Sequence, residues 1–154
     1  MKNKYFDTTV VIPTKNREGM LKRALSSVFR QTLLPKEVII VDDCSDHLVE
    51  MDVSDGIANL KVSIVNNSEC LGGAESRNIG VRLAQSKYIS FLDDDDTWDS
   101  TYLSRVATVL ESNAGVQAAY TSKRFVLSSS LDLVFKENIV SGIVGKAEIL
   151  RGNA

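Results

Sequence analysis

Four consecutive aspartates, Asp93 to Asp96, follow directly after the apolar segment Tyr88–Leu92. That segment has the length and composition of a buried β-strand, so the acids are expected at its carboxyl end, where open α/β sheets bind their ligands. Two carboxylates about 4 Å apart repel each other by roughly 4 kcal/mol at an effective dielectric constant of about 20. A hard divalent cation relieves this repulsion, and Mg²⁺ usually binds one or two protein carboxylates together with substrate phosphates. The acidic run therefore indicates a metal or phosphate site.

Helix capping or calcium binding could also account for acids at this position. Asp96 or Asp99 could cap the helix expected over residues 99–110, because an aspartate at a helix start accepts hydrogen bonds from free N–H groups. Capping accounts for one or two acids, but not for four in succession. A calcium-binding loop starting at Asp93 needs Gly at its sixth position and Glu at its twelfth, where this chain has Trp98 and Ser104. The calcium loop is therefore rejected.

Composition places the chain among ordinary globular proteins. Its 154 residues are enough for one domain with a hydrophobic core, and 44% are apolar and 25% charged. The 18 basic and 20 acidic residues give no charge excess that would favour nucleic acid or an anionic membrane. No apolar run approaches the ~20 residues of a transmembrane helix, and the polar N-terminus leads us to expect no signal peptide. We expect a cytoplasmic protein with no nucleic acid partner and no membrane span in this chain.

Outside the acidic run, the residues considered as metal ligands or catalytic groups are Cys44, Cys70 and His47. The cysteines have no metal-ligand spacing. Both follow predicted strands and could approach each other, but in a cytosolic protein two reduced thiols are expected. His47, the sole histidine, is expected in a solvated loop rather than as a catalytic base.

Short β-branched strands alternate with helical patterns along the chain. Strands are predicted at 8–13, 37–42, 61–65, 88–93 and 116–120, and helices at 20–29, 74–85 and 99–110. In the second helix, Ile79, Leu83 and Ala84 are expected to face inward. The segment 48–58 reads as a weaker helix or irregular structure, and 124–127 with 131–135 as a hairpin. This alternation predicts an α/β fold with a mainly parallel central sheet and helices on both faces, in a single domain over residues 1–154.

Parallel strands would bring three polar loops to one edge of this sheet. The loops carry Pro13–Arg17 after the first strand, Asp42 with Asp43 after the second, and the acidic run after the fourth. The first loop lacks the G-x-G-x-x-G element of dinucleotide-binding folds, and the chain has neither a P-loop nor a G-x-S-x-G nucleophile element. What remains is a nucleotide diphosphate site in which a metal bound by the acids carries the phosphates.

Two further side chains could complete such a site. Arg77, close to Gly72 and Gly73, could add positive charge for the phosphates, or it could be a solvated surface arginine. Asp42 could accept a hydrogen bond from a nucleobase imide N–H, or it could cap the turn that follows its strand. The sequence leaves both alternatives open.

Several segments carry a family resemblance in their order and spacing: Val11–Arg17, Ser26–Thr32, Pro35–Asp43, Asn66, Gly72, Ser76–Gly80 and Tyr88–Trp98. Over a stretch from about Thr8 to Tyr120 they resemble the family 2 glycosyltransferases of GT-A fold. Each motif is weak alone, whereas the ordered set is specific. The resemblance implies a Rossmann-like GT-A domain and an inverting transfer of a sugar from a nucleotide diphosphate donor, here expected to be a UDP-sugar, to a glycan or lipid-linked acceptor.

The resemblance also implies roles for individual residues. Asp93, Asp94 and Asp95 match the family's D-x-D element. Asp95 would be the principal Mg²⁺ or Mn²⁺ ligand with Asp93 beside it, and Asp94 would lie nearer the ribose or sugar. Trp98 is expected to pack rather than to stack on substrate. The nucleotide-sugar site would further contain Pro13, Thr14, Asn16 and Arg17 at the nucleoside, Asp42 and Asp43 at the base, and Gly73 and Arg77.

One departure from the family concerns the general base. In the family, a carboxylate base and the acceptor-binding segments lie well downstream of the D-x-D element, and here the chain stops at Ala154 before any such acid. We therefore expect the donor-binding part of a longer enzyme, truncated at its C-terminus, whose full-length form could lie at the cytoplasmic face of the membrane. Two alternatives stay open, a nucleotide-sugar-binding module without transfer activity and a nucleotidyltransferase. The second would need a Gly-rich loop after the first strand, and a phospho-acceptor signalling module is disfavoured by Asn66 and Asn67.

Overall fold

The computed structural model describes residues 5–47, 60–113, 115–119 and 121. It forms two compact units, residues 1–107 and 108–154. The sheet and all of the predicted site residues lie in the first unit. The single domain expected over residues 1–154 stays a prediction.

A four-stranded parallel sheet forms the centre of the first unit, in the order β3-β2-β1-β4. Its strands are β1 (Tyr5–Thr14), β2 (Leu34–Asp42), β3 (Lys61–Asn66) and β4 (Tyr88–Phe91). Because β1 and β2 are covered on both faces, they are almost continuously buried, as the β-branched sequence requires. This confirms the predicted α/β fold with a parallel sheet.

The register sets where each polar loop leaves the sheet. Thr14 pairs with Asp42, and Asp42 pairs with Asn66, so β1, β2 and β3 end level with one another. Phe91, the last residue of β4, pairs with Val11. The acids that follow β4 therefore begin beside the last residues of β1, at the same carboxyl edge as the other loops.

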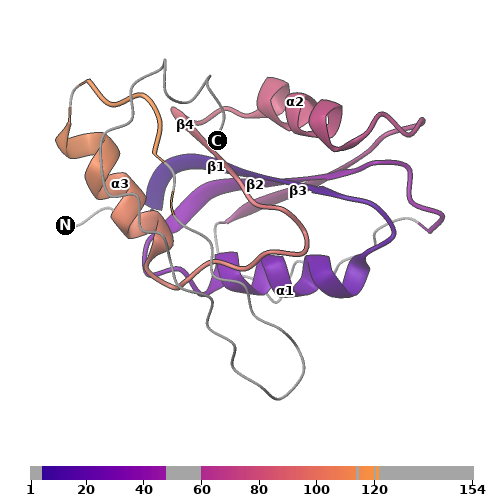
Figure 1. The fold of residues 1–154 in the computed structure, drawn as a ribbon, viewed down its shortest axis with the longest axis horizontal. Coiled ribbons are helices and arrows are strands. Elements are labelled where there is room, and N and C mark those ends of the chain that lie inside the picture. Colours follow the sequence, from indigo (N-terminus) through magenta and orange to yellow (C-terminus); the bar gives the residue numbers. More distant parts are fainter. Residues whose placement is uncertain (1–4, 48–59, 114, 120, 122–154) are drawn as a thin grey trace, which may run out of the picture. The chain divides into compact units, whose positions relative to one another are not determined.

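Two helices cover opposite faces of the sheet, as Figure 1 shows: α1 (Glu18–Phe29) and α2 (Gly73–Leu83). The apolar stripe of α1 packs on one face of β1 and β2 to form the core. This core contains Val10, Ile12, Leu21, Ala24, Leu25, Val28, Val38, Ile40 and Leu92. Trp98 packs against it and stacks on Tyr102 with ring centroids 4.3 Å apart, so the expected packing of Trp98 is seen.

α2 approaches the sheet through a small-residue face. Its buried residues are Ser76 and Gly80, and Gly80 lies directly against Val11 of β1. Ile79 is partly buried, but Leu83 is 47% exposed, so its predicted inward position is wrong. Leu83 is the last residue of the helix, and the close approach of the helix to the sheet is made at Gly80 instead.

The helix predicted from residue 99 begins later, as α3 (Tyr102–Ser112). Asp99 forms a turn before it instead, since its carboxylate accepts hydrogen bonds from the Thr101 N–H and hydroxyl. None of the helices in the described ranges is long and apolar enough to cross a membrane.

The fifth strand predicted at 116–120 is not formed at residues 116–119. There the Val116 N–H donates to the Asn113 carbonyl oxygen in a turn, and these four residues pair with no strand that the structure describes. A strand exists only when a neighbour completes its backbone hydrogen bonds, so a short apolar run is not sufficient. The predicted segment 48–58 and the hairpin at 124–135 lie outside the described residues.

Candidate functional site

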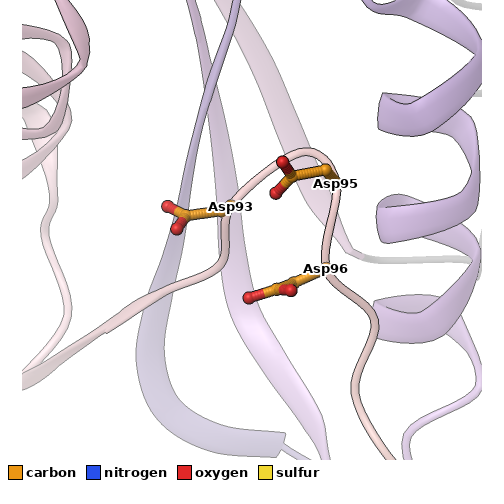
Figure 2. A group of neighbouring side chains, drawn as sticks. All are labelled: Asp93, Asp95 and Asp96. Atoms are coloured by element: carbon orange, nitrogen blue, oxygen red, sulfur yellow. The ribbon is translucent and has the colours of Figure 1, made fainter. Parts of the chain in front are cut away.

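The acidic loop, Asp93–Asp96, follows β4 at the carboxyl edge of the sheet. The Asp96 N–H donates to the Asp93 carbonyl oxygen at 3.1 Å, so the loop turns back on itself. Carboxylate oxygens of Asp93, Asp95 and Asp96 consequently lie within 4.8 Å of one another (Figure 2). Asp94 differs from these three. It is only 6% exposed, and its Oδ2 accepts a hydrogen bond of 2.8 Å from the Thr14 hydroxyl. The loop thus presents three grouped acids and one buried acid that joins it to β1.

Two arginines from other elements pair with these acids. Arg17, just before α1, has its Nη1 at 3.3 Å from both Asp94 Oδ1 and Asp95 Oδ2. Arg77, on α2, donates to Asp93 Oδ1. The Arg17–Asp95 and Arg77–Asp93 pairs are half exposed, and ion pairs of this kind contribute only about 0–1 kcal/mol. Arg17 can therefore exchange Asp95, and Arg77 can exchange Asp93, for another anion at little cost.

A cavity of about 370 Å³ opens between these loops. Its volume lies at the lower end of the range for small-molecule sites, about 300–1,000 Å³. It is lined by Pro13, Thr14, Lys15, Arg17, Asp43, Gly73, Arg77, Asp93, Asp94 and Asp95. Because cationic and anionic side chains line the same space, the cavity suits a polyanion that binds together with a cation.

Asp43 organises one wall of the cavity. Its carboxylate accepts hydrogen bonds from the N–H groups of Leu71 and Gly72, at 2.7 and 2.8 Å, and from Asn67 Nδ2 at 3.1 Å. Burial alone would raise the pKa of Asp43, but these hydrogen bonds and one from Ser76 favour the charged form and hold its pKa below the usual value. Gly72 has a φ of +85° there, which an L side chain rarely adopts. Asp43 thereby fixes the loop that starts α2 and places Gly73 and Arg77.

Asp42 and Asn16 are predicted in the site from the sequence but do not line the cavity. Asp42 is 1% exposed, and its Oδ1 accepts the Ser45 N–H at 3.2 Å, as in the capping alternative. Asn16 pairs with Asp46 through two hydrogen bonds, at 3.0 Å from its amide and 2.8 Å to its carbonyl oxygen. Both residues support the loops around the cavity. A base-reading role for Asp42 stays a prediction.

Two residues of the site are missed by sequence reasoning. Lys15 lines the cavity between two residues that the sequence does predict, Thr14 and Asn16, and only its position in that loop could have indicated it. Asp96 has the sequence context of a helix cap, whereas the turn in the acidic loop places its carboxylate with those of Asp93 and Asp95.

Cys44 and Cys70 form a disulfide with their Cα atoms 5.1 Å apart, so the expectation of two reduced thiols is wrong. The cause is the order of the strands. β2 and β3 are parallel neighbours that end level with each other, so the loops that follow them run side by side. Lys15 Nζ lies 3.1 Å from Cys70 Sγ. The disulfide therefore ties together two loops at the rim of the cavity.

Reduction of this disulfide is expected to lower the free energy of unfolding by about 3–4 kcal/mol, because the bond closes a loop with a sequence separation of 26 and restricts the unfolded chain. Urea unfolding with and without dithiothreitol measures the difference. Cys44→Ser is the matched control and should be insensitive to the reductant. Equal stability of the parent chain in both conditions would contradict the prediction.

The grouped acids fit a divalent cation. Their donor set is entirely carboxylate oxygen, which hard cations such as Mg²⁺ prefer. Two oxygens on one Mg²⁺ lie at most about 4.2 Å apart, because each bond is about 2.1 Å long. Oxygens already within 4.8 Å reach that spacing by small side-chain rotations.

Comparison with known proteins is consistent with this geometry. Residues 9–130 match the family model "Glycosyl transferase family 2". An uncharacterized glycosyltransferase of Haemophilus influenzae is 35% identical over 112 residues, covering 73% of this chain and 37% of the relative. The UDP-Glc:alpha-D-GlcNAc-diphosphoundecaprenol beta-1,3-glucosyltransferase WfaP of Escherichia coli is 28% identical over 123 residues, covering 78% of this chain and 49% of WfaP. The chain thus spans less than half the length of these curated relatives.

A solved structure shows the same fold with a ligand. S. aureus TarS 1-349 in complex with UDP-GlcNAc has a TM-score of 0.61 to this chain at 27% identity, over 70% of this chain and 32% of TarS. The matched family segment contains the parallel sheet except for the first four residues of β1, together with the acidic loop and every residue that lines the cavity. The chain therefore belongs to glycosyl transferase family 2 and has its GT-A fold.

Proposed function

We propose that the cavity binds a nucleotide diphosphate sugar, with UDP as the nucleotide, as the donor site of an inverting glycosyltransferase. The observation that carries this proposal is the placement of two grouped acids, Asp93 and Asp95, and two arginines around one cavity at the carboxyl edge of the sheet, with Asp96 grouped beside these acids. The UDP-GlcNAc complex of TarS and the UDP-Glc donor named for WfaP support UDP.

Each charged group has a role in this proposal. Asp95 and Asp93, with Asp96 beside them, would hold Mg²⁺ or Mn²⁺, which supplies Lewis-acid stabilisation of the charge on the departing diphosphate. Arg17 exchanges Asp95, and Arg77 exchanges Asp93, for diphosphate oxygens, to which a guanidinium can donate two hydrogen bonds. Asp94 stays tied to Thr14 and keeps the floor of the site in place near the ribose.

The acceptor side of the reaction needs further groups. We infer a glycan or lipid-linked acceptor, in line with the diphosphoundecaprenol-linked sugar named for WfaP. Its hydroxyl must lose a proton during attack, and a positioned general base contributes typically about 10²–10⁴-fold. We expect this base outside residues 1–154, in the whole protein.

The test is a thermal-shift panel of UDP, UDP-GlcNAc, UDP-Glc and GDP-mannose, each with Mn²⁺ or with EDTA. Binding to the folded state alone raises the free energy of unfolding by about 2.7 kcal/mol at a ligand concentration 100 times Kd. UDP ligands should stabilise the chain in Mn²⁺ and much less in EDTA. Stabilisation by GDP-mannose alone would overturn the choice of UDP, and no stabilisation by any nucleotide would overturn the donor site.

Two arginines on α2 offer a matched pair of variants for this panel. Arg77 pairs with Asp93 at the cavity, and Arg82 pairs with Glu75 at 2.7 Å on the exposed side of the helix. Arg77→Gln should weaken UDP binding, whereas Arg82→Gln should bind UDP like the parent. Equal behaviour of the two variants would show that Arg77 does not contact the diphosphate.

A further inference from the structure

The chain that leaves the acidic loop is anchored on the C-terminal end of α1. The Trp98 N–H donates to the Ser27 hydroxyl at 3.0 Å, and the Thr32 N–H donates to the Ser100 carbonyl oxygen at 2.8 Å. Between these two contacts lies Gln31, which is only 6% exposed. These contacts hold the segment 98–103, which follows the acids and leads into α3.

Gln31 uses both ends of its amide in this anchor. Its Nε2 donates to the Asp99 carbonyl oxygen at 2.7 Å and to the Ser27 carbonyl oxygen at 3.1 Å. Its Oε1 accepts the Leu103 N–H at 2.9 Å, one of the N–H groups that the first turn of α3 cannot satisfy itself. A single buried side chain therefore connects the end of α1 to both the turn at Asp99 and the first turn of α3.

The acidic loop is held separately at its other end. The Leu92 N–H donates to the Val11 carbonyl oxygen at 3.1 Å, and the Thr14 hydroxyl donates to Asp94. Asp95 and Asp96 lie between this anchor on β1 and the anchor on α1. Their position relative to Asp93 therefore depends on both anchors, although Gln31 does not line the cavity.

We infer that Gln31, with Ser27, is a positioning residue for Asp95 and Asp96 and thereby sets the affinity of the site for its divalent cation. This inference rests on the proposed metal-dependent donor site. Groups that hold metal ligands in place without touching the metal typically change metal affinity by roughly 10–100-fold when they are removed. Loss of the Gln31 amide should act in this way, by loosening the chain that carries two of the three acids.

The experiment measures UDP affinity by calorimetry in Mn²⁺ and in EDTA, well below the unfolding temperature. For Gln31→Leu, the affinity in Mn²⁺ should fall by roughly 10–100-fold, with the affinity in EDTA unchanged. Val28→Ala is the control, because Val28 is a fully buried core residue of α1 whose side chain makes none of the hydrogen bonds of the anchor. It should lower the unfolding temperature and keep the Mn²⁺-dependent affinity of the parent.

Ser27→Ala is a milder variant that removes the hydroxyl that accepts the Trp98 N–H and donates to the Ala24 carbonyl oxygen within α1. It provides a test should Gln31→Leu fail to fold. It should reduce the Mn²⁺-dependent affinity by a smaller factor. Trp98, the only tryptophan in the chain, gives a second readout, since its emission should shift to the red when the anchor is loosened.

The possible failures are distinguishable. If the parent chain shows no Mn²⁺-dependent UDP binding, the proposed donor site fails. The parent chain can instead bind UDP in an Mn²⁺-dependent manner while the UDP affinities of both Gln31→Leu and Ser27→Ala in Mn²⁺ stay within about threefold of the parental value, far less than the expected change. In that case only the positioning role is overturned. An equal loss of affinity in Mn²⁺ and in EDTA would likewise overturn it, because the metal would not be the group affected.

Discussion

Asp95→Asn is expected to remove the metal-dependent part of UDP binding while leaving the fold intact. The substitution keeps the shape of the side chain but removes the charge of a grouped acid that is about half exposed. Asp95 pairs with Arg17 in an exposed ion pair worth about 0–1 kcal/mol, so the free energy of unfolding should change by no more than about that amount. A direct ligand should matter at least as much as its supporting groups, so the UDP affinity in Mn²⁺ should fall by about 100-fold or more. Calorimetric titration with UDP in Mn²⁺ and in EDTA measures this loss.

Asp99→Asn is the matched control for this experiment. It makes the same change of charge close by, but the Asp99 carboxylate bonds to Thr101 in the turn before α3 and is not among the grouped acids. Asparagine forms such a turn as aspartate does, so both stability and affinity should stay close to those of the parent. UDP binding by Asp95→Asn at the parental affinity in Mn²⁺ would refute the metal assignment. Asp96→Asn tests whether the third grouped acid is also a ligand. The UDP affinity in Mn²⁺ should fall if Asp96 binds the metal, and it should stay at the parental value if Asp96 does not.

Gly80→Ala is expected to destabilise the chain, although alanine is the better helix former. A Cβ at Gly80 would lie 2.3 Å from Cγ1 and 2.9 Å from Cγ2 of Val11. Val11 is completely buried in β1, so its β-branched side chain has little freedom to rotate away. Overpacking of this kind costs typically about 1–3 kcal/mol, whereas the gain in helix propensity is only about 0.5–1 kcal/mol. Urea unfolding should therefore show a net loss of stability.

Two comparisons identify the cause of that loss. Gly19→Ala, in the first turn of α1, places its Cβ in open space and should be neutral or stabilising. The double variant Val11→Ala with Gly80→Ala removes the clashing methyl groups and should be more stable than the sum of the two single changes predicts. Additive effects of the two substitutions would show that the close approach of α2 to β1 does not limit stability.

Much of the site could be predicted because its residues follow parallel strands. The β-branched runs now seen as β1 and β2 indicated buried strands, and the polar segments after them had to reach one edge of the sheet. Thr14, Asp43 and the acidic loop were grouped on this basis, and all three contribute to the cavity lining. This part of the prediction depends only on local pattern and on the direction of the strands, which the sequence carries in full.

The individual roles within the site were decided only by tertiary contacts. The four aspartates are chemically identical, and nothing local distinguishes Asp94, which bonds to Thr14, from Asp96, which the turn brings to Asp93 and Asp95. The same holds for Gln31, whose amide bonds to the backbone of two residues on a segment far along the chain.

The order of the strands also had to come from the structure. Cys44 and Cys70 meet because β2 and β3 are neighbours, and α2 contacts the sheet through Gly80 because Val11 lies in the strand beneath it. The periodicity of apolar residues along the sequence predicts the local secondary structure and which of its residues are buried. The sequence alone therefore determined the fold class and the edge that carries the site. The direction of each loop side chain, and the partner it meets, depend on segments far apart in the sequence, and only the packed structure decides them.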